Sequence, residues 1–367
     1  MRPATRRSTR PVPVRGLVLG GANPVVVQGM IKRPAHDGPA VLDQVEALRS
    51  AGCELCRLAV PDAAAAATLG WVAQRTPLPL VADIHFDHRL ALLAIDAGAA
   101  KLRVNPGNLG GQAQLREVAN AATAARIPIR VGVNLGSLEH DLAAQYGYSG
   151  RAMAESALRQ VRSLEDLGFD LIVISAKAPD VARTVEAYRQ LSQSTNWPLH
   201  VGVTEAGPGA AGLVKSAVGI GILLAEGIGD TIRVSLTEDA VAEIDAAYSI
   251  LQSLGLRQRS VELVSCPTCG RCQFDLLPVA QAVAERLKSI DGSLTESFTV
   301  AVMGCAVNGP GEARRADVGV AGAAGDEAVL FAGGQVQRIV PAERAVDELM
   351  AEINRLLAEK RGKERSL

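Results

Sequence analysis

The sequence predicts a (β/α)8 barrel followed by a small α+β domain, and three observations support this fold class. Eight short β-rich runs occur at 25–30, 53–60, 79–86, 100–106, 129–136, 169–178, 199–207 and 230–237. The alanine-rich stretches between them carry apolar residues every three or four positions, which is typical of amphipathic helices. Successive runs begin 21 to 40 residues apart, the length of a βα unit, and eight such units form a barrel.

A doubly wound open sheet is the alternative fold. Such a sheet would normally carry a glycine-rich dinucleotide loop after an early strand. The sequence has no G-x-G-x-x-G at that place and no G-x-x-x-x-G-K-[ST] at any place. We therefore expect residues 21–255 to form the barrel and to bind the substrate.

The pattern of alternating strands and helices ends after residue 255. The following elements are expected to be a strand running into a cysteine cluster (261–272), a helix (274–290), a strand (297–305), a glycine-rich loop (306–317), two short strands (318–322 and 328–335) and a helix (342–360). These elements predict an α+β domain over 256–360, of ordinary domain size. The charged ends of the chain, 1–20 and 361–367, are expected to be a basic arm and a tail, both frayed.

The composition argues against several classes of protein. The net charge of −1 does not suit a general nucleic-acid binder. No run of 18 uncharged apolar residues predicts a membrane span, and the arginine-rich start lacks the apolar stretch of a secretory signal. A transit peptide remains an alternative for that start. Six cysteines in 367 residues do not make a disulfide scaffold, so we expect a cytoplasmic protein whose clustered cysteines bind metal.

Polar side chains mark the carboxyl ends of the predicted barrel strands, where barrel enzymes place their chemistry. These residues are Arg57, Asp83, His85, Arg103, Asn105, Arg130, Asn134, Ser175, Lys177, Thr204, Glu205, Arg233 and Ser235. The five cations among them would repel one another unless an anion joined them, and guanidinium groups match phosphate oxygens. The pattern therefore predicts a substrate with at least two phosphate charges, although ordinary ion pairing could explain any single arginine.

Three of these residues allow other interpretations. Asp83 and His85 would lie on one strand face as a metal pair, but the strand supplies no third ligand. Lys177 could form a Schiff base, although its cationic neighbours favour phosphate binding. Glu205 is a candidate general acid or base, or a counter-charge to the cations.

The second domain carries the stretch CPTCGRC, with Cys266, Cys269 and Cys272. A two-cluster ferredoxin run would need a fourth cysteine where Leu276 stands, and a zinc ribbon would need a second C-x2-C or a nearby His pair. A third option is an iron–sulfur cluster to which Cys305 contributes from the glycine-rich segment MGCAVNGPGEA. Cys53 and Cys56 form another C-x2-C, which we interpret as core packing.

The paired motifs SCPTC…FDL and MGC-x-VNGPGEA resemble those of the 4-hydroxy-3-methylbut-2-enyl diphosphate synthase family, an iron–sulfur oxidoreductase of non-mevalonate isoprenoid synthesis. ADIHFD, LRVNPGN, IRVGVNLGSLE, TEAG and EGIGDTIRVSLT extend this likeness over nearly the whole chain. The resemblance implies a 4Fe–4S cluster on Cys266, Cys269 and Cys305, with Glu312 as the resting fourth ligand that gives way to a substrate oxygen. Cys272 would be a spare thiol.

The resemblance also implies the reaction and its partners. The substrate would be 2-C-methyl-D-erythritol 2,4-cyclodiphosphate, opened and reductively dehydroxylated with electrons from flavodoxin or ferredoxin. Glu205 would supply the proton. Phosphate oxygens would be held by Arg57, Arg103, Arg130, Lys177 and Arg233, helped by His85, Asn105, Asn134 and Ser235, and Asp83 would also belong to the substrate-binding site. A homodimer is expected, in which one chain's cluster domain caps the partner's barrel.

One segment departs from the family pattern. Relatives usually end the first barrel strand in V-Q-S-M-T-N-T, whereas this chain reads VQGMIKRPAHD, with Lys32 and Arg33 in the loop. A non-catalytic paralogue that only binds the cyclodiphosphate is therefore one alternative. A Schiff-base aldolase with a structural zinc module is the other.

Overall fold

The computed structural model describes residues 5–259, 261–288, 290, 298–305 and 315–364. The chain forms two compact units that meet in the sequence between Arg257 and Gln258, and each has its own sheet and its own core. Among the described residues, no helix has both the length and the apolar character that crossing a bilayer requires.

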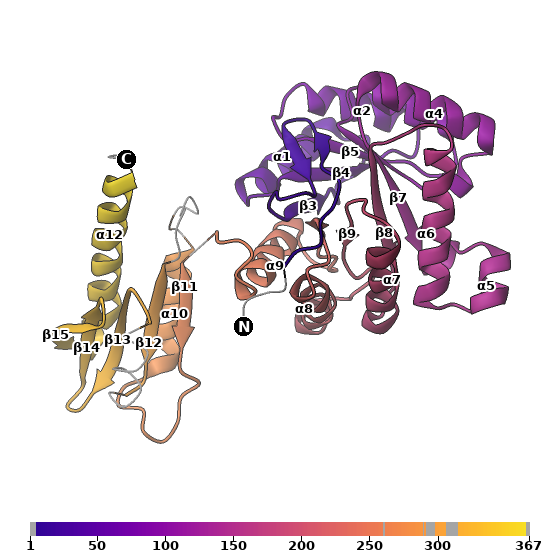
Figure 1. Ribbon diagram of the computed structural model, residues 1–367. Coiled ribbons are helices and arrows are strands. Elements are labelled where there is room, and N and C mark those ends of the chain that lie inside the picture. Colours follow the sequence, from indigo (N-terminus) through magenta and orange to yellow (C-terminus); the bar gives the residue numbers. More distant parts are fainter. Residues whose placement is uncertain (1–4, 260, 289, 291–297, 306–314, 365–367) are drawn as a thin grey trace. The chain divides into compact units, whose positions relative to one another are not determined.

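The first unit is an eight-stranded parallel barrel (Figure 1). Each strand pairs with its neighbour in chain order, and β10 pairs with β3. A parallel bridge between Ile174 and Leu199 joins the remaining edges, so the predicted barrel fold is confirmed. Its strands are β3 (Val26–Met30), β4 (Leu55–Ala59), β5 (Leu80–Asp83), β6 (Lys101–Val104), β7 (Ile129–Asn134), β8 (Ile172–Lys177), β9 (His200–Val201) and β10 (Thr231–Ile232).

Helices follow the strands and cover the barrel (Figure 1). Aspartates at the helix starts accept hydrogen bonds from backbone amides of the first turn, as Asp37 does from Ala40 and Asp239 from Val241. Such caps satisfy amides that have no partner inside the helix, so they help to fix where these loops at the carboxyl ends of the strands stop. The helices are α1 (Gly38–Ser50), α2 (Ala63–Ala73), α3 (His88–Asp96), α4 (Gln112–Ala125), α5 (His140–Tyr146), α6 (Gly150–Glu165), α7 (Val181–Ser194), α8 (Gly209–Ala225) and α9 (Ala240–Ser253).

The N-terminal arm differs from the frayed segment that we expected. Residues 12–19 form an antiparallel hairpin of β1 (Val12–Val14) and β2 (Leu17–Leu19), whose alternate apolar side chains are buried in the barrel core. Thr9 donates to Asp230, directly before β10, and the amide of Arg10 donates to the carbonyl of Asn196, shortly before β9. The arm therefore lies at the amino ends of these strands, opposite the candidate site, and its arginine content concealed the apolar alternation.

The described residues of the second unit form a five-stranded sheet with helices α10 (Leu276–Leu287) and α12 (Ala345–Glu364). Apolar side chains of both helices share one core with the sheet. The strands, in sheet order, are β11 (Glu262–Ser265), β12 (Thr299–Met303), β13 (Val318–Ala323), β14 (Glu327–Ala332) and β15 (Gln335–Pro341). Strand β15 was not predicted, because its side chains are almost all exposed, and α12 continues past residue 360, where the predicted helix ended.

Candidate active site

An open cavity of about 380 Å³ lies at the carboxyl ends of the barrel strands. Six different strands or the loops directly after them contribute to it, because the chain returns to the same end of the barrel in every βα unit. The cavity is lined by Arg57, Arg103, Arg130, Asn134, Ser175, Lys177, Val203, Thr204, Arg233 and Ser235. The structure thus brings all five predicted cations together in one place.

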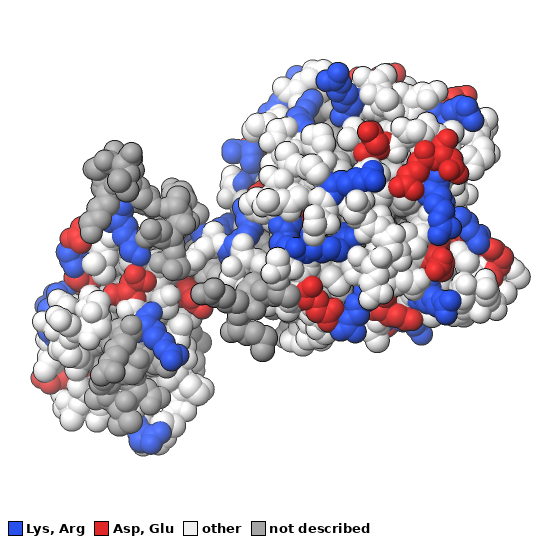
Figure 2. All heavy atoms as spheres, viewed as in Figure 1, with Lys and Arg blue, Asp and Glu red and all other residues white. Residues whose placement is uncertain are grey.

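The near-neutral total charge conceals this local excess. Lys and Arg atoms form a band across the middle of the face of the barrel unit that Figure 2 shows. Inside the cavity, Arg130 is 1% exposed, and its Nε and Nη1 have no hydrogen-bond partner among the described residues. Burial, together with Arg57 and Arg103, lowers the pKa of Arg130 well below its usual value. These uncompensated donors are suited to an anionic ligand.

Asp83 is the carboxylate that orders two of these cations. Its Oδ2 lies 2.9 Å from Arg57 Nη2, and its Oδ1 lies 3.1 Å from Arg103 Nη1. Burial alone would raise the pKa of Asp83, but Arg57, His85 and Arg103 outweigh it and hold the pKa far below its usual value. Asp83 is therefore a fixed negative charge that orients the guanidinium groups, and this geometry does not favour the metal-pair interpretation.

Two glycines make room for the cations to cross the barrel. A β-carbon at Gly132, in β7, would lie 2.5 Å from Nε of Arg103. A β-carbon at Gly202, directly after β9, would lie 2.8 Å from Nζ of Lys177 and 2.4 Å from the carbonyl oxygen of Arg233. A side chain at either position would push these groups aside, so the repeated V-G-V of these strands helps to shape the cavity.

Lys177 lies at the floor of the cavity, with its Nζ 3.0 Å from Nε2 of His200. Burial, Arg130 and Arg233 lower the pKa of Lys177 well below its usual value. A lowered pKa would suit a Schiff-base lysine, and the surrounding arginines would suit an anion contact. The geometry of Lys177 alone therefore does not choose between the two interpretations.

Three other predicted residues lie in the segments directly after barrel strands. His85 is half-exposed, with Nε2 2.6 Å from Nη1 of Arg103. Asn105 is buried and its side chain accepts from the amide of Gly107, so it stabilises its own loop. Glu205 is exposed in the loop after β9, directly after Thr204, with a left-handed backbone (φ 51°). Glu312 lies outside the described residues.

Three buried polar residues near this site, Lys101, His200 and Glu243, were not predicted from the sequence. Lys101 lies beneath the cavity with Nζ 3.4 Å from Oε1 of Gln28, and strand alternation from Arg103 was a signal that could have found it. His200 contacts Lys177. Glu243 lies on helix α9 and approaches Arg233 at the strand ends. Its position on a helix gives no sequence signal that it belongs with the polar residues of the strand ends.

Cys266 and Cys272 of the second unit lie beside Gly304, which directly precedes Cys305. The amide of Gly304 is 3.2 Å from Sγ of Cys266, and a β-carbon at this glycine would lie 3.4 Å from that sulfur and 2.5 Å from Sγ of Cys272. Cys305 is buried, Cys269 is exposed, and the Cys272 thiol donates to the carbonyl of Phe274. Among the described residues, no three His, Cys, Asp or Glu side chains are gathered closely enough to hold a metal ion.

The residues around Gly304 nevertheless fit an iron–sulfur cluster chemically. Thiolates are the usual ligands of such clusters. The glycine leaves space beside Cys266, and its amide already points at a sulfur atom, which is the contact that exposed amides make to cluster sulfides. The donor set is therefore suitable for the predicted cluster.

Comparison with known proteins identifies the family. The model of the GcpE TIM-barrel domain matches residues 9–248, and that of the GcpE protein C-terminal domain matches residues 262–355. The chain belongs to the GcpE family. The barrel and the cysteine-bearing unit described above are therefore the two domains of a GcpE protein.

Curated relatives in the GcpE family share about half of their residues with this chain. A protein of Geobacter sulfurreducens is 53% identical over 97% of this chain and 99% of its own length, and one of Nitratidesulfovibrio vulgaris is 50% identical over 98% and 93%. Both are named 4-hydroxy-3-methylbut-2-en-1-yl diphosphate synthase (flavodoxin). These matches confirm the family predicted from the motifs, and with it the class of enzyme, an oxidoreductase of isoprenoid synthesis.

Solved structures show the barrel independently of this family. A dihydropteroate synthase of Yersinia pestis aligns with 68% of this chain and 100% of its own chain, with a TM-score of 0.50 and 16% identity. At that identity the likeness concerns the fold alone.

Proposed function

We propose that this chain converts 2-C-methyl-D-erythritol 2,4-cyclodiphosphate into 4-hydroxy-3-methylbut-2-enyl diphosphate by reductive ring opening and dehydroxylation. The observation that carries the proposal is the cavity in which five cations converge while Asp83 pairs with only two of them. A cyclic diphosphate presents charged oxygens on several sides, so it can meet guanidinium groups from several strands at once. The names of the relatives fit this chemistry.

In this proposal, the cavity residues bind and orient the substrate. Arg57 and Arg103, held by Asp83, present fixed donors to phosphate oxygens, and Arg130, Lys177 and Arg233 complete the contacts from neighbouring strands. Holding the diphosphate at several points fixes the carbon skeleton relative to the reacting groups. Asn134 and Ser235 line the same cavity and would add neutral hydrogen bonds, with His85 at its edge.

Glu205 is the proposed proton donor. Its carboxyl group is carried by the exposed loop after β9, next to the cavity-lining Thr204. Its left-handed φ of 51° is a conformation that residues other than glycine rarely adopt, and such strain is often found at functional sites. The hydroxyl group that is lost leaves as water and needs a proton at the departing oxygen, whereas the phosphate oxygen released by ring opening can leave as an anion. A carboxyl group beside the bound substrate can supply that proton.

Cys266, Cys269 and Cys305, with Glu312, are proposed to hold a 4Fe–4S cluster, which when bound supplies the two electrons of the reduction. Flavodoxin is the proposed external donor, in keeping with the relatives' names, and ferredoxin is the alternative. We further propose that the enzyme acts in the cytoplasm as the homodimer expected from the family, with one chain's cluster domain over the partner's barrel.

The test is purification without oxygen, followed by iron and sulfide analysis and turnover with chemically reduced flavodoxin. About four irons and four sulfides per chain, and product formation from the cyclodiphosphate, would support the proposal. Zinc without sulfide, together with borohydride trapping of substrate on Lys177, would favour the aldolase interpretation instead. A loaded cluster and a bound substrate without turnover would identify a non-catalytic paralogue.

A further inference from the structure

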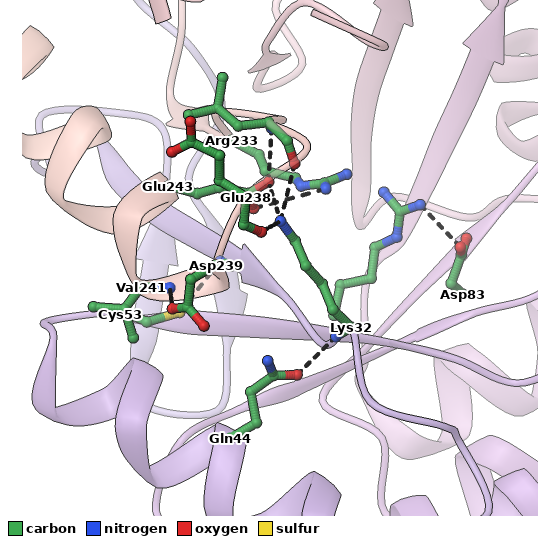
Figure 3. A network of polar contacts seen from close by, with 12 residues as sticks. Lys32, Gln44, Cys53, Asp83, Arg233, Glu238, Asp239, Val241 and Glu243 are labelled. Atoms are coloured by element: carbon green, nitrogen blue, oxygen red, sulfur yellow. Dashed lines mark hydrogen bonds and ion pairs between the residues drawn. The ribbon is translucent and has the colours of Figure 1, made fainter. Parts of the chain in front are cut away.

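Lys32 lies in the loop after β3 that departs from the family pattern, and it contacts the loop after β10. Its ammonium group lies 2.9 Å from Oε1 of Glu243, 3.0 Å from the carbonyl oxygen of Leu236 and 2.5 Å from that of Glu238 (Figure 3). An ammonium group has three N–H donors, and each of them therefore has an oxygen acceptor. Lys32 differs in this respect from an ordinary surface lysine.

The backbone of Lys32 is held as well as its side chain. Oε1 of Gln44, on helix α1, accepts from the amide of Lys32 at 2.7 Å and from that of Arg33 at 3.2 Å. Figure 3 shows Gln44 at the backbone of Lys32 and the acceptors of the ammonium group at the other end of the side chain. Lys32 thus connects α1, through its backbone, to the β10–α9 loop, through its side chain.

The partner of Lys32 is a buried carboxylate. Glu243 is 1% exposed, and its Oε1 also accepts from the amide of Leu236 at 2.8 Å. Its Oε2 has no hydrogen-bond partner among the described residues, and Nη2 of Arg233 stands 3.8 Å away. Two cations therefore flank one buried negative charge, and Lys32 is the nearer of the two.

The loop that Lys32 holds carries part of the anion-binding cavity. Arg233 and Ser235 line the cavity, whereas Lys32 is not among its lining residues. On its other side, this loop is joined to the β9–α8 loop, because the Glu238 side chain accepts from the amide of Gly209 at 2.7 Å. The position of the β10–α9 loop thus depends on contacts with both of its neighbours around the mouth.

We propose that Lys32 is a positioning residue for anion binding, which neutralises Glu243 and so leaves the Arg233 guanidinium to face the cavity. Without Lys32, Arg233 would be the cation nearest to Glu243. An unpaired buried carboxylate is strongly unfavourable, so the guanidinium would turn toward Oε2 and away from a bound phosphate. The inference rests on the proposed function only in taking the natural anion to be the cyclic diphosphate.

The test uses full-length protein purified without oxygen and inorganic pyrophosphate as the probe, with affinity measured by calorimetry. Lys32→Met should weaken pyrophosphate binding about tenfold, because the Arg233 guanidinium then turns toward Glu243 and away from the cavity. Arg33→Met is the matched control: it removes the same charge one residue away, from an exposed side chain outside the cavity lining, and should bind like wild type. The double variant Lys32→Met, Glu243→Gln should recover most of the affinity, because the carboxylate that attracts Arg233 is gone.

Steady-state kinetics separate a positioning role of Lys32 from a merely structural one. With the cyclodiphosphate, Lys32→Met should raise KM about tenfold and leave kcat within about twofold, since only binding is affected. Equal pyrophosphate affinities of Lys32→Met and Arg33→Met would overturn the inference, and so would a double variant weaker than Lys32→Met. Weakened pyrophosphate binding in a protein that never turns over the cyclodiphosphate would support the role of Lys32 and refute the proposed function.

Discussion

Nζ of Lys177 lies 3.0 Å from Nε2 of His200, and both side chains are buried at the floor of the cavity. A protonated Lys177 can only donate, so Nε2 of a neutral His200 would accept from it, and the imidazole proton would then be on Nδ1, 3.3 Å from Oγ1 of Thr231. Burial and then Lys177 lower the pKa of His200 well below its usual value. The neutral imidazole of His200 therefore adds no positive charge at the floor of the cavity.

The first prediction concerns this histidine and the pH dependence of stability. The unfolded chain takes up a proton at His200 as the pH falls through about 6.5, whereas the folded chain does not, so the free energy of unfolding falls below that pH. Between pH 7.5 and 5.5, wild type should lose about 1 kcal/mol more than His200→Gln. Urea unfolding followed by the fluorescence of Trp71 and Trp197, both in the barrel unit, measures this difference. Equal losses in the two proteins would mean that His200 is not held neutral.

The second prediction concerns Arg130, whose buried guanidinium has two nitrogens, Nε and Nη1, without a hydrogen-bond partner in the part of the chain that the structure describes. Replacing an uncompensated buried charge with an apolar side chain is often stabilising. Arg130→Met should therefore raise the free energy of unfolding by about 1–3 kcal/mol while kcat/KM for the cyclodiphosphate falls steeply. The same fluorescence-detected unfolding, with turnover assays on the same preparations, checks both effects. A variant less stable than wild type would show that Arg130 has a structural partner.

The third prediction concerns the orientation of Arg57 and Arg103 by Asp83. Asp83→Asn keeps the shape of the side chain but removes the charge that holds both guanidinium groups. Misplaced binding groups should lower kcat/KM about a hundredfold. Asp87→Asn is the control, because Asp87 pairs with Arg89 outside the cavity lining. Similar kinetics for both variants would argue against orientation by Asp83.

The fourth prediction separates the cysteines of the second unit. Cys272→Ser should keep wild-type iron and sulfide contents, because this thiol donates to the carbonyl of Phe274 and is not a proposed ligand. Cys305→Ser should lose most of both, since it removes one of the three proposed thiolates. Iron and sulfide analysis of anaerobically purified protein makes the comparison, and loss of the cluster in Cys272→Ser would place that residue among the ligands.

The fifth prediction concerns Glu312 and depends on the sequence alone. Glu312→Ala should loosen one iron, so that about three irons and four sulfides remain per chain, and turnover should drop. Electron paramagnetic resonance would reveal the incomplete cluster. An unchanged turnover rate and iron content would contradict the assignment of Glu312 as the fourth ligand.

The barrel and the cations at its mouth were predictable because both follow from local rules. Eight strands at regular spacing determine the topology, and the ends of parallel strands meet at one edge, so Arg57, Arg103 and Arg130 had to converge. The hairpin of residues 12–19 was not predictable in the same way. Its short apolar alternation is surrounded by arginines, and only burial against the barrel gives it structure.

The sequence by itself thus determined which charged residues the barrel strands carry and where along each strand they lie. It also determined the family, because several long motifs of that family occur in the right order. Which charge pairs with which was decided by tertiary structure. Glu243 comes from helix α9 and Lys32 from the loop after β3, and closure of the barrel brings them to 2.9 Å from each other. The physical reason is that ion pairing depends on distances of a few ångströms in space, whereas a sequence specifies only the order along the chain.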